Sequence, residues 1–347
     1  FNPQDNNIPY FLSEVIPNAK LAFHKSFSEA HVPGRHLNAL LAAREVLGSD
    51  VTEDDVIAKH ANALYFAYEG TLPLPLNRTH LHGPLNRFLP HNLREGFHGL
   101  YALIRFQHAD KTMAIIQKSI DFIFRYWVPT RTWDHQIFQT NNIEVEEWPG
   151  PFITGIARCI GPLVKIYAAT GYGRALELAI VLKDEALQHY FLADGSYSSE
   201  KHGFHTHSLT CTLSSLARLA DLTNDSVLKE RVRAFYENGL KKISNSIGWC
   251  IENSGEHANP DRGECNNTGD ILETALLLGK WGYAHYFQDA ERILRGHLLP
   301  SQLRDVSFIK EPPNPAHEDG LHQVAQRHLG AFGFPAPYGH QPLGETH

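Results

Sequence analysis

The chain has 347 residues, a net charge of -7 and 42% hydrophobic residues. It has no apolar run near the roughly 18 residues of a membrane-spanning helix, and no basic surplus for phosphate backbones, so we expect neither a membrane nor a nucleic acid as a partner. Its four cysteines match no zinc or disulfide spacing. These properties indicate a globular protein and are equally compatible with a secreted, a periplasmic and a cytoplasmic location.

Helical patterns recur in pairs along the chain. Five pairs can be traced, at about 35–69, 92–127, 151–193, 205–245 and 266–299. The segments 151–171 and 206–224 carry two charges each, which is typical of buried helices, whereas 174–192 and 226–244 are amphipathic. The sequence therefore predicts an all-α fold, an (α/α)6-type toroid of helical hairpins with buried inner helices and half-exposed outer ones.

A sixth pair is not visible in the C-terminal segment 300–347, because prolines such as Pro312, Pro335 and Pro337 interrupt any long helix. We expect irregular structure there, which leaves the toroid incomplete or closes it together with the N-terminal segment. A chain cut from a longer protein would show the same pattern. We predict a single catalytic domain over residues 1–347.

The connections alternate between loops rich in His, Asp, Glu or Trp and short, bland links. The rich loops are His31–His36, His91–His98, Glu146–Trp148, His202–His207 and Asp261–Cys265. The bland links are Leu47–Asp50, His108–Asp110, Gly171–Gly173, Thr223–Asp225 and Gly282–Tyr283. Because each rich loop stands ahead of an apolar helix pattern, we expect these loops to open on one face and to form the functional site.

The loop before the last hairpin carries the strongest candidates. Its acidic residues are Glu252, Glu256, Asp261 and Glu264. Carboxylates over a cavity suit general acid and base catalysis on a glycosidic bond, although acidic residues also favour helix N-termini. We expect the following helix to begin near Asn267 or Thr268, and we predict Glu264 or Asp261 as a catalytic carboxylate.

Two histidines, His205 and His207, stand at the start of the fourth inner helix. If the segment is extended, both side chains point the same way, whereas a helix would separate them by about 200°. They could bind a metal, transfer protons or contact sugar hydroxyl groups. We predict sugar contacts or proton transfer, and we expect no metal and no other cofactor.

The loop before the third hairpin combines acids with an aromatic ring. Trp148 could stack on a pyranose while Glu146 takes its hydroxyl groups, and Glu147 could supply the second catalytic carboxylate. Burial of the indole in the core is an equal alternative.

The remaining predicted substrate contacts have weaker signals. Arg87 and Arg94 could hold the carboxylate of an acidic sugar, because a guanidinium fork matches it, although surface salt bridges are the commoner fate of Arg. His91, His36 and Asn267 complete this set because they lie in or beside the rich loops.

The run GECNNTGDILETALLLGKWGYAHYFQDAERILRGHLLPSQ, from Gly263 to Gln302, resembles six-hairpin glycosidases, notably relatives of glycoside hydrolase family 127 and, more loosely, family 154. The resemblance implies a sugar-cleaving enzyme, and family 154 implies uronic-acid glycosides. Family 127 shows a Glu-x-Cys motif, whereas Glu264 and Cys265 are adjacent here. Its zinc–thiolate centre also requires a Cys-Cys-x-x-Asn motif that this chain does not contain, so that mechanism is not carried over.

The sequence thus predicts an enzyme that hydrolyses a glycosidic bond in a uronic-acid-containing oligosaccharide or polysaccharide by paired carboxylates. One alternative is a lyase that cleaves such glycans by β-elimination, with His205, His207 or Tyr65 as base and Arg94 as neutraliser. Another is a non-catalytic helical-repeat scaffold that binds a protein on a concave surface. A homo-oligomer is compatible with each of these.

Overall fold

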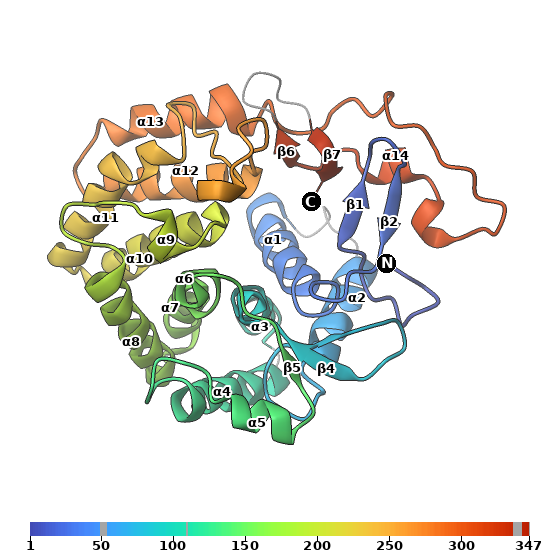
Figure 1. Cartoon of the computed structure of the whole chain (residues 1–347), viewed down its shortest axis with the longest axis horizontal. Coiled ribbons are helices and arrows are strands. Elements are labelled where there is room, and N and C mark those ends of the chain that lie inside the picture. Colours follow the sequence, from blue (N-terminus) through green and yellow to red (C-terminus); the bar gives the residue numbers. More distant parts are fainter. Residues whose placement is uncertain (49–53, 109, 336–341, 347) are drawn as a thin grey trace. The chain divides into compact units, whose positions relative to one another are not determined.

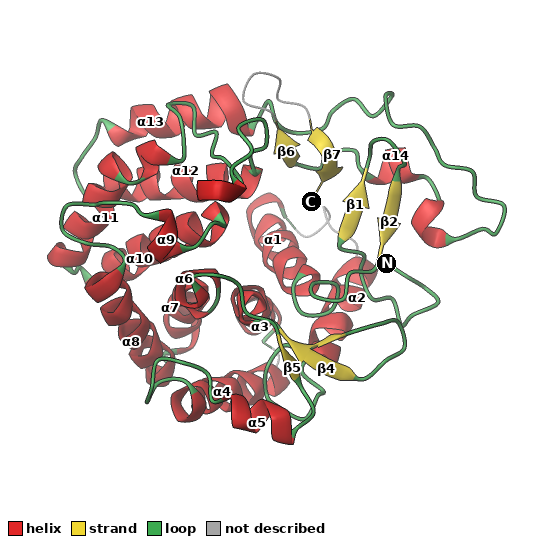
Figure 2. Ribbon diagram, viewed as in Figure 1, coloured by secondary structure: helices red, strands yellow, loops and turns green. Residues whose placement is uncertain are grey.

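The computed structural model describes residues 1–48, 54–108, 110–335 and 342–346. Figure 2 shows that helices predominate and that strands are short, so the predicted all-α class is confirmed. Parts of two predicted links, residues 49–50 and 109, lie outside the described residues, as does Pro337. No helix in the described part of the chain has the length and apolarity needed to cross a bilayer.

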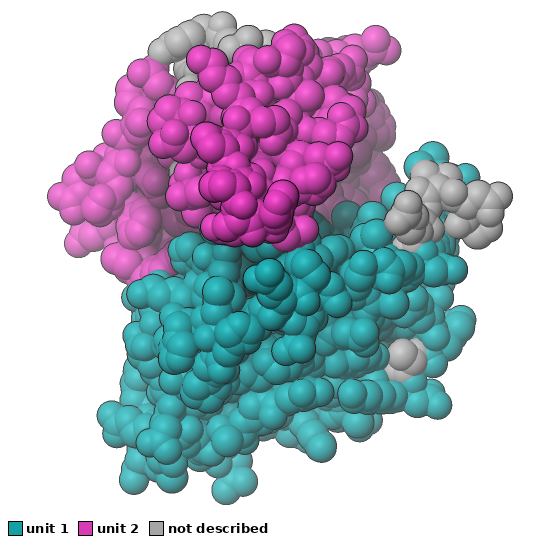
Figure 3. Space-filling model, turned by 90° about the vertical axis from the view of Figure 1, so that its right-hand side faces the viewer, with its two compact units in different colours: residues 1–11, 22–147, 162–181 teal, residues 12–21, 148–161, 182–347 magenta. Residues whose placement is uncertain are grey.

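The chain forms two compact units, which Figure 3 colours separately. Unit 1 comprises residues 1–11, 22–147 and 162–181, and unit 2 comprises 12–21, 148–161 and 182–347. The single catalytic domain over residues 1–347 stays a prediction.

Unit 1 contains the first two predicted hairpins. Its helices are α1 (Val32–Leu47), α2 (Asp54–Ala67), α3 (Leu93–Gln107), α4 (Asp110–Tyr126) and the short α5 (His135–Thr140). Helix α1 packs against α2 and α3 (Figure 1). The backbones of α1 and α3 approach closely at Gly34, where a Cβ atom would lie 1.8 Å from the carbonyl oxygen of Glu95. Only glycine fits at this crossing.

Unit 1 also has a small sheet of β3 (Asn77–Arg78), β4 (Leu85–Phe88) and β5 (Glu144–Val145). The 3-10 turn η2 (Pro90–Asn92) lies between β4 and α3 in the chain. Strand β4 lies in the middle, antiparallel to β3 and parallel to β5. This register sets Arg87 opposite Glu144, 57 positions away in the chain.

Unit 2 contains the last two predicted hairpins. They consist of α10 (Thr206–Thr223), α11 (Ser226–Asn238), α12 (Cys265–Lys280) and α13 (Tyr286–Ile293). Helix α10 packs against α11 and α12, and its residues are buried along most of its length, so the predicted inner helix is confirmed. The link after α10 is also confirmed: Asn224 takes the left-handed conformation, and the Asp225 carboxylate accepts a hydrogen bond from the Leu228 amide at 3.0 Å.

The predicted inner helix over 151–171 is interrupted. The structure has α6 (Pro151–Thr154), the 3-10 turn η3 (Ile156–Cys159) and then α7 (Ile160–Thr170), with α8 (Gly173–His189) as the outer partner. Gly155, at φ -119° and ψ -106°, separates the first two pieces because its backbone conformation is not helical. The buried character of the segment is as predicted, since residues 152–164 are buried.

The C-terminal segment is irregular, as predicted, and it pairs with the N-terminal segment. Strands β1 (Leu12–Glu14), β2 (Lys20–Ala22), β6 (Gly333–Pro335) and β7 (Pro342–Thr346) form one sheet in the order β2-β1-β7-β6. A small core beneath it contains Val15, Ala19, Leu303, Ile309 and Val324. The other short elements of unit 2 are α9 (Ser199–His202), η4 (Leu240–Lys242), η5 (Gly255–His257), the π-helical turn η6 (Leu294–Leu298), η7 (Asp319–Leu321) and α14 (Val324–Arg327).

Candidate functional site

Main-chain hydrogen bonds in unit 2 bring the starts of α10 and α12 to either side of the segment 250–253. The Thr206 amide donates to the Glu252 carbonyl at 3.0 Å, and the Glu264 amide donates to the Cys250 carbonyl at 3.3 Å. A further antiparallel bridge joins Ile251 to Gly263. The short ladder fixes two of the rich loops relative to each other.

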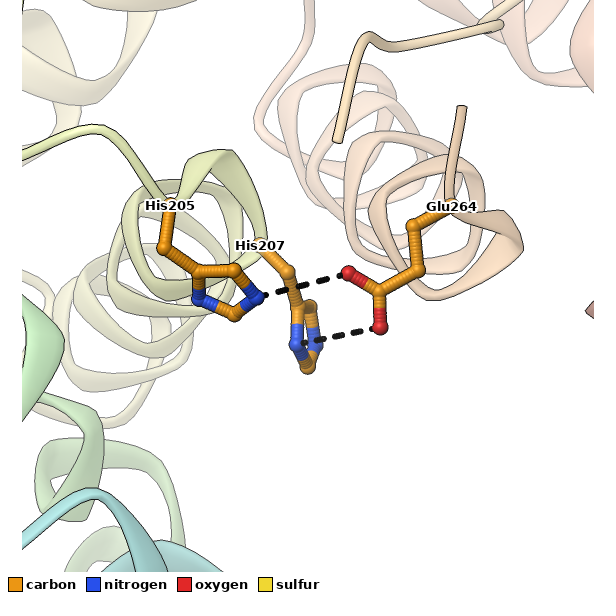
Figure 4. A group of neighbouring side chains, drawn as sticks. All are labelled: His205, His207 and Glu264. Atoms are coloured by element: carbon orange, nitrogen blue, oxygen red, sulfur yellow. Dashed lines mark ion pairs between the residues drawn. The ribbon is translucent and has the colours of Figure 1, made fainter. Parts of the chain in front are cut away.

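His205, His207 and Glu264 converge at this ladder (Figure 4). His205 Nε2 lies 3.6 Å from Glu264 Oε2, and His207 Nδ1 lies 3.9 Å from Glu264 Oε1. His205 is extended at the N-cap of α10 and His207 lies in its first turn, so the change of backbone conformation between them lets both rings face one carboxylate. Glu264 is itself the N-cap residue of α12.

A second carboxylate lies on the other side of His207. Asp270 Oδ2 is 3.4 Å from His207 Nε2, and it accepts a hydrogen bond from Thr210 Oγ1 at 3.1 Å. His207 and Asp270 are both buried. The imidazole of His207 therefore lies between two carboxylates, Asp270 at 3.4 Å and Glu264 at 3.9 Å.

Trp148 marks the accessible side of this cluster. Its ring meets the His205 ring edge-on, with 5.5 Å between the centroids, and both side chains are only partly buried. The side chain of His205 is 13% exposed, compared with 3% for His207. A ligand that reached Trp148 would therefore meet His205 first.

Glu252 adds an acid with a shifted pKa. Burial raises the pKa of its carboxyl group, and the negative charge of Glu264 acts in the same direction, whereas the ion pair with Arg262 opposes the shift. The sequence places Glu252 in the acidic loop but does not distinguish it from its neighbours. Its position opposite Arg262 in the short ladder is visible only in the structure.

Asn267, predicted to contact substrate, is fully buried instead. Its Nδ2 donates to Thr206 Oγ1 at 3.2 Å, and its Oδ1 accepts from Thr210 Oγ1 at 2.8 Å. The side chain links α10 to α12 and has no exposed surface for a ligand. We therefore correct its assignment to that of a positioning residue. Helix α12 also begins at Cys265, two residues before Asn267.

Asp261 is an exposed residue of the acidic loop. Its amide donates to Asn259 Oδ1 at 3.0 Å in the turn before Arg262. Of the two carboxylates proposed from the sequence in this loop, the structure brings Glu264 to the histidines, and a catalytic role for Asp261 stays a prediction.

Glu147, the predicted partner carboxylate, belongs to unit 1. Its Oε2 lies 3.6 Å from His135 Nε2, and its side chain is 33% exposed. The pairing of Glu147 with Glu264 stays a prediction, and within unit 2 the acids near Glu264 are Glu252 and Asp270.

Arg87 and Glu146, predicted sugar contacts, bind each other. Arg87 Nη2 donates to Glu146 Oε2 at 2.7 Å, and its Nη1 donates to Glu144 Oε1 at 2.6 Å. The guanidinium of Arg87 is buried and faces two carboxylates, so in this structure it forms ion pairs, and its role as a clamp for an acidic sugar stays a prediction. Ser26 Oγ also donates to Glu146 Oε2, at 2.8 Å.

The remaining predicted contacts lie in polar clusters of unit 1. His91 stacks on His31 with 5.7 Å between ring centroids, and Arg94 Nη1 donates to Glu95 Oε1 at 2.7 Å. His36 Nδ1 lies 3.1 Å from His60 Nε2, and burial lowers the pKa of His36 to about 4. A substrate role for these residues stays a prediction.

The three-thiolate zinc centre of family 127 does not fit this chain. All four cysteines are buried thiols, and burial raises the pKa of Cys265 to about 11. Among the described residues, each group of side chains that could hold a metal ion contains at most one cysteine. These residues therefore do not support a catalytic step through a three-thiolate zinc centre.

No protein-family model and no curated protein sequence matches the chain, but solved structures share its fold. A sugar epimerase from a ruminal bacterium has a TM-score of 0.62 at 11% identity, over 87% of this chain and 84% of that one. A β-arabinofuranosidase of glycoside hydrolase family 127 has a TM-score of 0.53 at 17% identity, over 95% of this chain and 50% of that one. An unsaturated glucuronyl hydrolase from Bacillus sp. GL1 has a TM-score of 0.55 at 10% identity, over 83% and 78%.

At these identities the similarity shows the fold alone, which is of the (α/α)6-toroid type. The predicted fold class and the resemblance to family 127 are thereby confirmed. The chain spans half the length of the β-arabinofuranosidase. What the chain itself acts on is a separate matter, because one fold can carry many activities.

Proposed function

We propose that this protein is a carbohydrate-active enzyme that hydrolyses a glycosidic bond, with Glu264 as its central carboxylate. The observation that carries the proposal is the convergence of His205 and His207 on Glu264, with Trp148 beside the more exposed of the two histidines. A carboxylate, proton-carrying imidazoles and an aromatic ring are the groups that bind and cleave a sugar chain.

The two acids of this site have different neighbours: Glu264 faces the two histidines, and Glu252 pairs with Arg262. Imidazoles that carry a proton stabilise the ionised form of Glu264, which suits a base or a nucleophile. Glu252 has its pKa raised by burial and by the charge of Glu264, which suits an acid that protonates the leaving oxygen. In this division of roles, Glu252 takes the place that the sequence had assigned to Glu147.

We further propose a uronic-acid-containing glycan as the substrate. The cationic groups on the accessible side of the site would be Arg262, which lies beside Glu252, and His205 when it is protonated. Either could meet a uronate carboxylate. Support also comes from the shared fold with a hydrolase whose name describes unsaturated glucuronyl substrates.

A second candidate is proton abstraction from a sugar carbon, which would lead to epimerisation or to β-elimination. The 3.6 Å approach of His205 Nε2 to Glu264 favours it, because a carboxylate that orients an imidazole makes it a better base. The shared fold with a sugar epimerase is compatible with the same chemistry.

One experiment separates these reactions. The purified protein is incubated in D2O with neutral and uronic-acid oligosaccharides, and three products are followed: new reducing ends, the absorbance of unsaturated uronate, and deuterium bound to carbon. Reducing ends alone support hydrolysis. New absorbance indicates elimination, deuterium on carbon without cleavage indicates epimerisation, and either result would replace the hydrolase proposal. The absence of all three products would favour a non-catalytic scaffold.

A further inference from the structure

We infer that His207, Cys211 and Asp270 form a binding site for a divalent transition-metal ion, with Zn2+ as the best match. Their ligand atoms are an imidazole nitrogen, a thiol sulfur and a carboxylate oxygen, which all lie within 4.8 Å of one another. All three residues are buried. This inference does not rest on the proposed function, because metal binding is measured without any substrate.

Helix geometry brings the three ligands together. His207 and Cys211 are four residues apart on α10, so both project from one face of that helix. Asp270 lies on α12, which packs against α10. Two ligands from one helix turn and one from a neighbouring helix make a site that a folded helical pair can hold rigidly.

The distances suit a small tetrahedral ion. Nitrogen and oxygen ligands at 2.0–2.1 Å from zinc lie about 3.4 Å apart in a tetrahedron. His207 Nε2 and Asp270 Oδ2 are 3.4 Å apart. A thiolate belongs about 3.6 Å from such a nitrogen. The Cys211 sulfur lies at most 4.8 Å from it, so the sulfur must move closer by at most about 1.2 Å.

The surroundings of the three ligands favour a cation. His207 Nδ1 faces Glu264 at 3.9 Å, and a metal-bound histidine commonly directs its other nitrogen to a carboxylate. Arg158 Nε donates to Cys211 Sγ at 3.4 Å and can support a thiolate. Two ionised carboxylates and one thiolate carry three negative charges, which Arg158 and a divalent ion would balance.

The proton that leaves when the metal binds can be accounted for. The Cys211 thiol donates to the Ser208 carbonyl at 3.3 Å, and its S–H bond breaks as the bond between metal and sulfur forms. One proton per ion leaves for the solvent, while Asp270 and neutral His207 bind without further proton loss. The softness of a thiolate selects Zn2+ over Mg2+ or Ca2+.

The competing explanation is an imidazolium at His207 that bridges Asp270 and Glu264 with no metal. The test is to strip the tag-free protein with a chelator, add Zn2+ alone, and measure bound metal per chain and protons released. We expect one ion and one proton. Co2+ in place of Zn2+ should give the intense near-ultraviolet absorption of a cobalt–thiolate bond.

Single substitutions test which residues bind the ion. We expect Cys211→Ser to weaken Zn2+ binding by more than about 100-fold, since loss of an outer-shell partner alone costs 10–100-fold. Cys159→Ser is the matched control, because Cys159 is equally buried but belongs to no candidate ligand group among the residues that the structure describes. His205→Ala should also leave affinity for Zn2+ nearly unchanged.

Three outcomes would overturn the inference: no ion above background, equal binding by Cys211→Ser and Cys159→Ser, or loss of binding in His205→Ala. The last would move the ion to His205, His207 and Glu264, which form the other group with metal-ligand spacing. If Cys211→Ser does not fold, the Co2+ spectra of the unaltered protein and of Cys159→Ser decide, because only a thiolate ligand produces that absorption and, among the described residues, Cys211 is the cysteine that belongs to a group with metal-ligand spacing.

Discussion

Replacing Asn267 with alanine should weaken the contact between α10 and α12 that supports the candidate site. The change removes a hydrogen bond from Thr210 at 2.8 Å and one to Thr206 at 3.2 Å, each worth about 0.5–1.5 kcal/mol. The cavity left at a fully buried position adds roughly 1 kcal/mol. We therefore expect a loss of about 2–4 kcal/mol in the free energy of unfolding.

The variant N267D sharpens this prediction. Its carboxylate can still accept from Thr210, but Thr206 Oγ1 already donates to the Glu252 carbonyl at 2.9 Å and offers the new carboxylate no proton. The added charge also lies near Asp270, because Thr210 contacts both side chains. We expect N267D to be less stable than N267A at pH 7 and to recover in part at pH 5.

Urea unfolding followed by circular dichroism measures both variants, with Asn238→Ala as the control. Asn238 Nδ2 donates to the Asp194 carbonyl at 2.8 Å in an exposed position, so its loss should cost little. An N267A protein within about 0.5 kcal/mol of the original, or an N267D protein as stable as the original at pH 7, would refute the assigned positioning role.

Three further predictions concern buried charges in unit 1. Arg78 donates to Glu29 at 2.6 Å and to Asp5 at 2.9 Å, so Arg78→Met should cost about 3–5 kcal/mol at pH 7 and less at pH 4, in urea unfolding at both pH values. Burial raises the pKa of Glu29 to about 7, so the folded state binds more protons; the contribution of Glu29 to stability, measured as the difference in urea unfolding between the original protein and Glu29→Gln, should fall as pH rises from about 4.5 to 7. Burial lowers the pKa of His36 to about 4 and that of His60 to about 2, so the contribution of these two histidines to stability should fall as pH drops below about 6.5; relative to the original protein, His36→Gln should therefore gain stability in urea unfolding as pH falls.

The helical pairs could be read from the sequence because they depend on local periodicity. The link at Asn224 and Asp225 is an example, since a left-handed Asn and an acidic N-cap act within a few residues. The break at Gly155 was missed because glycine within an apolar helix pattern is often tolerated. The terminal sheet was missed because β1 and β7 are more than 300 residues apart, and no local pattern encodes such a pairing.

The candidate site was predicted in part for the same reason. The loops that carry His205, His207 and Glu264 stood out by composition, and the structure joins them. The sequence could not show which face of α12 meets α10, so the burial of Asn267 and the contact between Asp270 and His207 were not foreseen. Likewise, partners far away in sequence decide whether an arginine binds a ligand or a carboxylate.

The most direct test of the central claim compares Glu264→Gln with Glu256→Gln on the oligosaccharide that the protein cleaves. Both residues lie in the same loop, but Glu264 is buried against the histidines, whereas the side chain of Glu256 is 90% exposed. We predict that Glu264→Gln lowers kcat by about 10²–10⁴-fold, the usual contribution of a general acid or base, while Glu256→Gln stays near the original rate. If Glu264→Gln folds and retains the original kcat, Glu264 is not the catalytic carboxylate and the account is contradicted.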